Sequence, residues 1–173
     1  MSFFELIKTR RSIRAYAPRA VEPEKIDAIL SAANAAPSAG NLQAYEILVV
    51  RDAATRRDLV HAALGQEFLT QVPVVLVFFA HPDRSAAKYR QRGAGLYSVQ
   101  DATIACAYAQ LAATELGLGT VWVGAFDDAA VAKAVGAKPE WKPVAMLPIG
   151  YPAESPAATP RRNLNDLIHH HDQ

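Results

Sequence analysis

The chain has 173 residues, of which 51% are apolar and 20% charged, a composition that excludes an intrinsically disordered protein. Eighteen Lys and Arg residues against 17 Asp and Glu residues give a formal net charge of +1. This balance argues against a protein that wraps nucleic acid or lies on an anionic membrane. The length favours a single domain over residues 1–173, with enough chain to bury a sizeable core.

The cysteine and histidine content excludes two further kinds of site. The one cysteine, Cys106, cannot form an intrachain disulfide, and the five histidines have no spacing typical of metal ligands, so we expect no metal. The N-terminal segment reads as having no apolar leader, and the uncharged segment 102–114 is shorter than the roughly 20 residues of a membrane span. These features predict a soluble, cytoplasmic protein.

Helices and strands are predicted from apolar spacing, capping residues and turn formers. A helix over 21–36 has apolar residues at i, i+3, i+4 and i+7, and Pro37 ends it. Asp52 is the expected N-cap of the next helix. Further helices are predicted over 3–9, 52–64, 97–116 and 127–135, strands over 45–50, 72–80, 120–123 and 144–150, and a tail from 151 that runs extended to a last turn at 164–169.

Two of these elements carry information about the architecture. The strand 72–80 is almost continuously apolar, which indicates burial on both faces. The middle of the helix 97–116 is apolar nearly all round, which is typical of a helix inside a protein or inside an oligomer. For the polar segment 84–97 the sequence predicts neither a helix nor a strand.

A basic segment follows the first predicted helix. Arg10, Arg11, Ser12 and Arg14 place three guanidinium groups and a hydroxyl within five residues, a set that suits a bound oxyanion. The alternative is that these arginines complement the helix C-terminus and stay solvated. Arg161 and Arg162 form a second basic pair near the other end of the chain, where a solvated tail is the alternative.

Two segments rich in small residues are candidate ligand loops. The segment 37–43, Pro-Ser-Ala-Gly-Asn-Leu-Gln, combines small residues with amides that can pair with a heterocycle, although an ordinary loop has the same composition. The segment 117–126 is no dinucleotide fingerprint because Trp122 stands where the third glycine is needed. Its alternative interpretation is a helix end that feeds a buried strand. Cys106 lies in an apolar helix and is expected to be buried and inert.

Read in chain order, these segments resemble one family, the FMN-dependent nitroreductases, and in particular its short, compact branch. The resemblance covers essentially the whole chain. One departure is that the family loop continues Gln-Pro-Trp, whereas this chain has Gln43-Ala44-Tyr45. The matching motifs are TRRSIRAY at 9–16, APSAGNLQ at 36–43, LGLGTVWVGAF at 116–126, PVAMLPIGYP at 143–152 and the pair Arg161-Arg162.

The resemblance implies an α+β fold with a central mixed or antiparallel sheet flanked by helices, in an intertwined homodimer with FMN at the interface. It also implies a site for the FMN phosphate and ribityl chain, a backbone segment beside the flavin ring, and a loop that reaches the flavin of the partner subunit. The cofactor-binding residues so implied are Arg10, Arg11, Ser12, Arg14, Pro37, Ser38, Ala39, Asn41, Gln43, Gln66, Gly124, Ala125, Arg161 and Arg162.

The implied activity is hydride transfer from NADH or NADPH through flavin N5 to a small oxidant such as a nitroaromatic or quinone, with ping-pong kinetics. The flavin then carries the chemistry, and no catalytic side chain is expected. An alternative is a flavin-binding or storage protein on the same scaffold without turnover. A nucleic-acid binder that uses Arg10, Arg11 and Arg14 is a weaker alternative, because the net charge counts against it.

Overall fold

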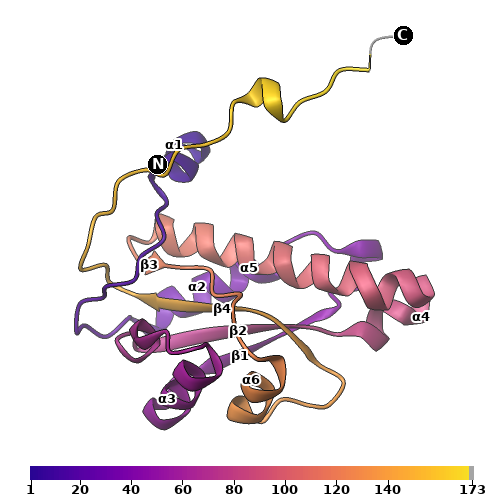
Figure 1. Cartoon of the computed structure of the whole chain (residues 1–173), viewed down its shortest axis with the longest axis horizontal. Helices are drawn as coiled ribbons and strands as arrows, with labels where there is room; N and C mark the ends of the chain where they lie inside the picture. Colours follow the sequence, from indigo (N-terminus) through magenta and orange to yellow (C-terminus); the bar gives the residue numbers. More distant parts are fainter. Residues whose placement is uncertain (172–173) are drawn as a thin grey trace.

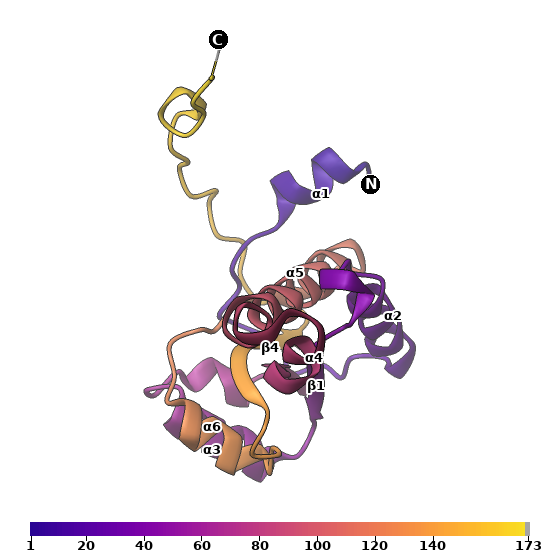
Figure 2. The same ribbon diagram turned by 90° about the vertical axis from the view of Figure 1, so that its right-hand side faces the viewer.

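A computed structural model describes residues 1–171 of the chain. Its elements form three layers, with α5 and α2 on one face of a central sheet and α3 and α6 on the other (Figures 1 and 2). The helices are α1 (Phe3–Thr9), α2 (Pro23–Asn34), α3 (Ala53–Ala62), α4 (Pro82–Arg92), α5 (Ser98–Glu115) and α6 (Asp128–Val135), with single turns η1 (Ala39–Asn41), η2 (Glu67–Thr70), η3 (Gly93–Tyr97) and η4 (Leu164–Asp166). The strands are β1 (Tyr45–Val50), β2 (Val74–Ala80), β3 (Gly119–Thr120) and β4 (Lys142–Gly150).

The sheet has the strand order β1-β2-β4-β3, and all its ladders are antiparallel. Within residues 1–171, parallel pairing is confined to an isolated bridge between Ser12 and Thr120. The combination of helices with this sheet confirms the predicted α+β class in its antiparallel form.

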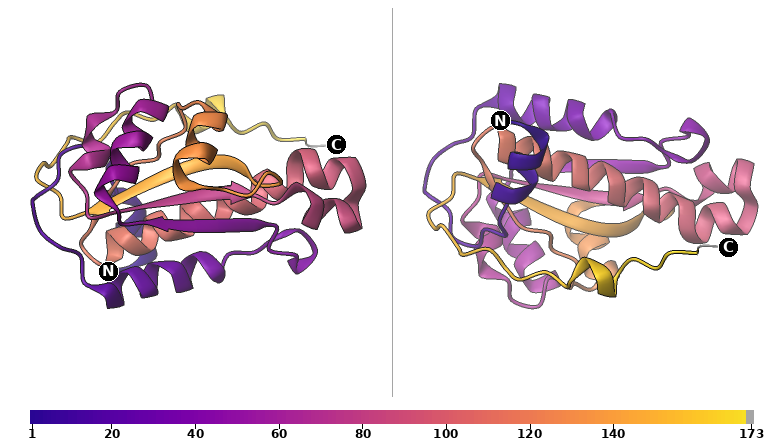
Figure 3. Two further views of the ribbon diagram at one scale, coloured as in Figure 1. Left: turned by 90° about the horizontal axis from the view of Figure 1, so that it is seen from below. Right: turned by 90° about the horizontal axis from the view of Figure 1, so that it is seen from above.

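Strand β2 lies at the centre of the core and is buried along its whole length, as predicted. Alternate side chains of a strand point to opposite faces, so β2 contributes to both halves of the core. Leu76 and Phe78 pack with α2 and α5, whereas Val77 and Phe79 pack with α3 and α6. Figure 3 shows these two helical layers from below and from above.

Helix α5 packs only one of its faces on the core. Ala102, Cys106 and Ala109 are fully buried against the sheet. On the opposite side Ala107 and Leu111 are half-buried, and Tyr108 is 41% exposed. The helix is therefore apolar on a face that this chain leaves uncovered.

Both ends of the chain lie outside the layers. Helix α1 has no buried residue, and Phe3 and Phe4 are more than 60% exposed. The C-terminal tail leaves the body of the protein (Figures 1 and 2), and Leu164 and Ile168 on it are at least 50% exposed. These apolar side chains are unburied within one chain.

The main differences from the sequence prediction concern two segments. The polar segment 84–97 forms most of α4 and the π-helical turn η3. The helix begins here because Pro82 occupies its first turn and the His81 side chain accepts a hydrogen bond from the Arg84 N–H at 3.3 Å. Strand β3 is two residues long instead of four, since the chain after Thr120 makes only one further bridge, from Val123 to Met146.

Candidate functional site

A basic cavity of about 430 Å³ lies where the end of α1, the following segment and the C-terminal tail meet. Its lining includes five cationic side chains and no carboxylate. The lining residues are Ile7, Lys8, Arg10, Arg11, Ser12, Arg14, Pro156, Ala157, Ala158, Thr159 and Arg161. Lys8 was not among the residues predicted from the sequence. It lies in the last turn of α1, which places it in the lining of the cavity.

The backbone of the basic segment is held against the sheet. The Ile13 N–H donates to the carbonyl of Thr120 at 2.9 Å, beside the bridge between Ser12 and Thr120. This close approach depends on Gly119, because a Cβ there would lie 2.9 Å from Cγ2 of Ile13. The sequence Gly119-Thr120 thus places Ser12 and Arg14 at a defined position.

The tail returns to the same segment by backbone pairing. The Ala17 N–H donates to the Tyr151 carbonyl at 2.8 Å, and the Ala153 N–H donates to the Ala15 carbonyl at 2.9 Å. The Glu154 carboxylate accepts the Arg14 N–H at 2.5 Å. These contacts explain how Arg161 reaches a cavity built by residues near the N-terminus.

The arginines of the cavity differ in what they already bind. Arg11 donates from Nη1 to the carbonyls of Lys8 and Arg10 at 2.6 and 2.9 Å. It therefore also caps the C-terminus of α1, which was the alternative interpretation of the basic segment. Within residues 1–171, neither Arg10 nor Arg14 pairs with a carboxylate. Arg162 does not line the cavity, and its Nη2 donates to the Asp166 carbonyl at 2.8 Å.

A second group of the implied residues lies around the loop before α6. The Gln66 side chain donates from Nε2 to the carbonyls of Ala63 and Ala125, both at 3.1 Å. Gly124 and Ala125 are exposed and follow Val123, whose N–H and C=O pair with Met146. The structure therefore joins Gln66 to Ala125 directly.

The loop 37–43 is a third group, and its backbone has an unusual conformation. Gly40, Asn41 and Gln43 have φ values of 58°, 57° and 47°, in the left-handed region. The Ser38 Oγ accepts the Gln43 N–H at 2.9 Å, and the Gln43 Nε2 donates to Asn41 Oδ1 at 2.8 Å. The side chains of the loop are thus tied to one another, and Pro37 and Asn41 are exposed.

This loop lies far from the basic cavity of the same chain. The Ala39 N–H donates to Asp101 in the first turn of α5, whereas the N-terminal ammonium, next to α1, pairs with Glu115 in the last turn at 3.5 Å. The 18 residues of α5 span about 27 Å at about 1.5 Å per residue. A single chain therefore does not bring all the implied residues to one ligand.

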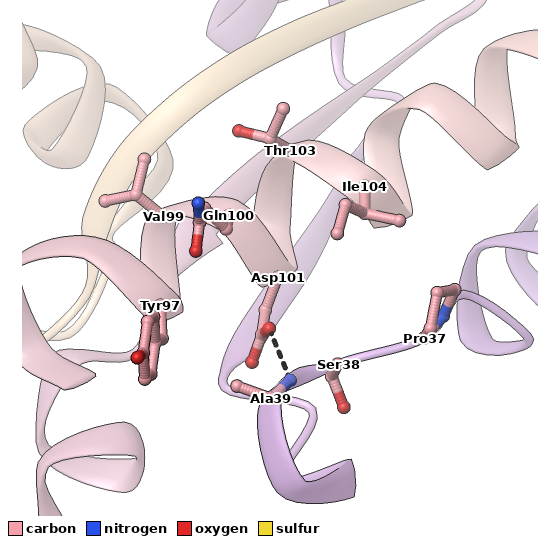
Figure 4. A pocket seen from close by; sticks show the side chains of 9 residues that line it. All are labelled: Pro37, Ser38, Ala39, Tyr97, Val99, Gln100, Asp101, Thr103 and Ile104. Atoms are coloured by element: carbon pink, nitrogen blue, oxygen red, sulfur yellow. Dashed lines mark hydrogen bonds between the residues drawn. The ribbon is translucent and has the colours of Figure 1, made fainter. Parts of the chain in front are cut away.

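An open apolar cavity of about 500 Å³ adjoins the loop (Figure 4). It lies between the start of the loop, at Pro37, Ser38 and Ala39, and the end of η3 with the first turns of α5. Tyr97 of η3 and Ile104 of α5 are among its lining residues. Asp101 also lines it, and sequence reasoning missed this residue. The available signal was a carboxylate at the start of a helix whose next 13 residues, 102–114, carry no charge.

Other kinds of site find no support in the described part of the chain. Residues 1–171 contain no group of three or more His, Cys, Asp or Glu residues placed to hold a metal ion. Their helices include none with the length and hydropathy needed to cross a membrane. Cys106 is fully buried, and burial raises the pKa of its thiol, as expected for an inert cysteine.

This fold and these motifs define a member of a known class: the chain belongs to the nitroreductase family, whose model matches residues 7–66 and 60–151. Among its relatives, the NADH dehydrogenase of Thermus thermophilus is 33% identical and covers 92% of this chain and 91% of its own. The FMN reductase [NAD(P)H] of Bacillus subtilis is 34% identical over 91% of this chain and 70% of its own. The solved structure of B. megaterium NfrA2 is 30% identical, with a TM-score of 0.90, over 98% of this chain and 74% of that one.

Proposed function

We propose that residues 1–173 form one FMN-binding domain that acts as an NAD(P)H-dependent oxidoreductase on a small oxidant such as a nitroaromatic or quinone. Membership of the nitroreductase family and similarity to an FMN reductase support the activity. The observation that carries the proposal in the structure is the basic cavity, which the two ends of the chain build together.

The chemistry of this cavity fits the phosphate of FMN. A phosphate monoester carries about −1.5 to −2 charges at neutral pH, and guanidinium groups bind its oxygens with charge-assisted hydrogen bonds. Arg10, Arg14 and Arg161 supply such groups, Ser12 adds a neutral donor, and no carboxylate lines the cavity. In a protein of net charge +1, this concentration of cations suits one small dianion rather than a polyanion.

Bound FMN would supply the redox chemistry, by accepting hydride from NAD(P)H and reducing the oxidant. The protein's residues bind and orient. Gly124 and Ala125 offer an exposed backbone to the flavin ring, because neither side chain blocks approach, and Gln66 holds that backbone at the Ala125 carbonyl. Because NAD(P)H and the oxidant would occupy one pocket in turn, we expect ping-pong kinetics.

We propose further that the protein is an intertwined homodimer in which the loop 37–43 completes the FMN site of the partner subunit. The loop and the basic cavity lie at opposite ends of α5, so two antiparallel copies of α5 would bring one chain's loop to the other chain's cavity. The uncovered apolar face of α5 supports this packing, as do the exposed side chains of α1 and the tail. Pro37, Ser38, Ala39, Asn41 and Gln43 are the loop residues that take part.

An absorbance spectrum of the purified protein tests the proposal, followed by anaerobic addition of NADH and of NADPH. We expect a yellow protein whose flavin absorption is bleached by at least one nicotinamide and restored by a quinone. A colourless protein that refuses added FMN would contradict the proposal. Bound FMN that neither nicotinamide reduces would favour the alternative of a flavin-binding or storage protein.

A further inference from the structure

Asp101 is a buried carboxylate whose place in the fold is explained by one loop. It lies in the first turn of α5 and is 2% exposed. No cationic side chain within residues 1–171 lies within ion-pair distance of it. A polar side chain removed from water needs hydrogen-bond partners, so the groups that bind Asp101 indicate what it does.

Those donors are two backbone N–H groups at the two ends of the loop. Oδ1 of Asp101 accepts the Ala39 N–H at 2.9 Å, and Oδ2 accepts the Ala44 N–H at 3.2 Å (Figure 4 shows the first of these). One rigid carboxylate on the central helix thus bridges the start and the end of the segment that contains Asn41 and Gln43.

The loop needs such a support because its own conformation is costly. Asn41 and Gln43 are non-glycine residues in the left-handed region, which the surrounding structure must stabilise. The loop's internal contacts are short-range turns, such as the Asn41 N–H to Ser38 carbonyl bond at 3.0 Å. Arg84 of α4 adds one external contact, from Nε to the Leu42 carbonyl at 2.8 Å.

We propose that Asp101 is a positioning residue that holds the loop 37–43 in the conformation in which it meets the flavin of the partner subunit. This inference rests on the proposed function, because the loop is a flavin contact only in the FMN-bound homodimer. Asp101 itself is not in contact with the flavin in this proposal. It acts through the Ala39 and Ala44 backbone, which sets where the Ser38, Asn41 and Gln43 side chains point.

The chemistry requires a carboxylate at this position. Both of its oxygens accept hydrogen bonds, whereas an asparagine side chain has one oxygen acceptor and one NH₂ group that cannot accept a backbone N–H. Asp101→Asn keeps the shape of the side chain but leaves one of the two N–H groups without an acceptor. The loop would then relax from its left-handed conformation while the helix and the sheet keep their packing.

The test compares full-length wild-type protein with Asp101→Asn, and uses Asp58→Asn as the matched control. Asp58 lies on α3, on the other side of the sheet, and is exposed. For each protein we would measure the oligomeric state, the thermal midpoint, the Kd for FMN from flavin fluorescence, and the visible absorption and circular dichroism spectra at saturating FMN.

We expect Asp101→Asn to remain a folded dimer, to bind FMN about tenfold more weakly, and to show an altered visible spectrum even when every site is filled. The control should match wild type in both respects. Should Asp101→Asn not fold, Asp101→Ser, which is smaller and neutral, carries the test with the same expectation.

An unchanged Kd and an unchanged spectrum in the folded variant would overturn the inference. A lower thermal midpoint with both flavin properties unchanged would also overturn it, because that pattern belongs to a merely structural carboxylate. Failure of the proposed function looks different, since the wild-type protein would then bind no FMN at all.

Discussion

The Gln66 side chain donates a hydrogen bond to the Ala125 carbonyl at 3.1 Å and so joins two residues that are 59 positions apart. The same Nε2 atom donates to the Ala63 carbonyl at the end of α3. One amide thus fixes the loop before α6 relative to α3. This matters for the site, because that loop offers the exposed backbone of Gly124 and Ala125.

Gln66→Glu tests this link with little change in shape. A glutamate carboxylate cannot donate to the two carbonyls and would place a negative charge beside them. We expect a loss of about 1–3 kcal/mol in the free energy of unfolding, the usual scale for two hydrogen bonds replaced by unfavourable contacts. We also expect weaker FMN binding. Urea unfolding and flavin fluorescence measure the two effects, and Gln91→Glu on the exposed side of α4 is the control.

Arg10→Ala combined with Arg14→Ala tests the basic cavity. Hydrogen bonds to charged groups contribute about 1.5–3 kcal/mol each, so the double variant should bind FMN at least about 100-fold more weakly. The fold should persist, since neither side chain pairs with a carboxylate in the described chain. The measurement is flavin absorption after purification together with the Kd of added FMN. Arg51→Ala with Arg57→Ala makes a control of equal charge, and FMN retention by the Arg10 and Arg14 variant would refute the assignment of the cavity.

Gly119→Ala tests how the sheet positions the basic segment. The added methyl group would lie about as close as 2.9 Å to Ile13 Cγ2, so Ile13 must move and take Ser12 with it. Overpacking of this kind costs about 1–3 kcal/mol of stability. We expect that loss in denaturant unfolding, together with a raised Kd for FMN. Gly95→Ala is the control because a Cβ there meets nothing within 4 Å, and equal behaviour of the two variants would contradict the argument.

Much of the fold was predictable because local signals agree with tertiary packing. Strand β2 is apolar throughout and is buried on both faces, and Asp52 accepts the Thr55 N–H at 2.7 Å as the N-cap of α3. Helix α4 was not predicted, since a histidine cap and a very polar sequence resemble a loop. The hydrogen bonds of Asp101 were equally hidden, because its partners Ala39 and Ala44 are 62 and 57 residues away in the sequence.

The candidate site was predictable only in part for the same reason. The arginines at the two ends of the chain are visible in the sequence, and the tail does fold back so that Arg161 joins Arg10 at one cavity. Backbone hydrogen bonds hold the tail there, from Ala17 to Tyr151 and from Ala153 to Ala15. Such backbone contacts cannot be predicted from a pattern of side chains. The assignment of these residues to FMN stays a prediction.

Tyr151→Phe tests a hydrogen-bonded network at the start of the tail. The Tyr151 hydroxyl donates to Glu22 Oε2 at 2.6 Å and accepts from Lys25 Nζ at 2.9 Å. The hydrogen bond from Tyr151 is the main cause that lowers the pKa of Glu22 to about 2, from an ordinary value of 4.5. A carboxyl whose pKa is lower in the folded protein stabilises the fold above its unfolded pKa and loses that effect as the pH falls through its folded pKa.

The wild-type protein should therefore be more stable than Tyr151→Phe at pH 7, and the difference should shrink between about pH 4.5 and pH 2. Thermal unfolding across this range measures it. In a Glu22→Gln background the same substitution should lose its pH dependence, because no carboxylate remains to titrate. A pH-independent difference in both backgrounds would show that the Tyr151 hydroxyl does not act through Glu22.

Ala107→Glu tests the proposed homodimer and the sharing of its sites. Ala107 lies on the uncovered face of α5 beside Tyr108 and Leu111. Helix α5 contains no Lys or Arg, so a two-fold contact of α5 with its copy would bury two new carboxylates with no cation on either helix. We expect a monomer by size-exclusion chromatography and a loss of bound FMN, because the loop 37–43 would no longer reach the partner's cavity. Ala129→Glu, on the exposed side of α6, should stay dimeric and yellow. A monomeric variant that keeps its FMN would show that one chain suffices for the site, and an unaffected dimer would show that α5 is not the contact.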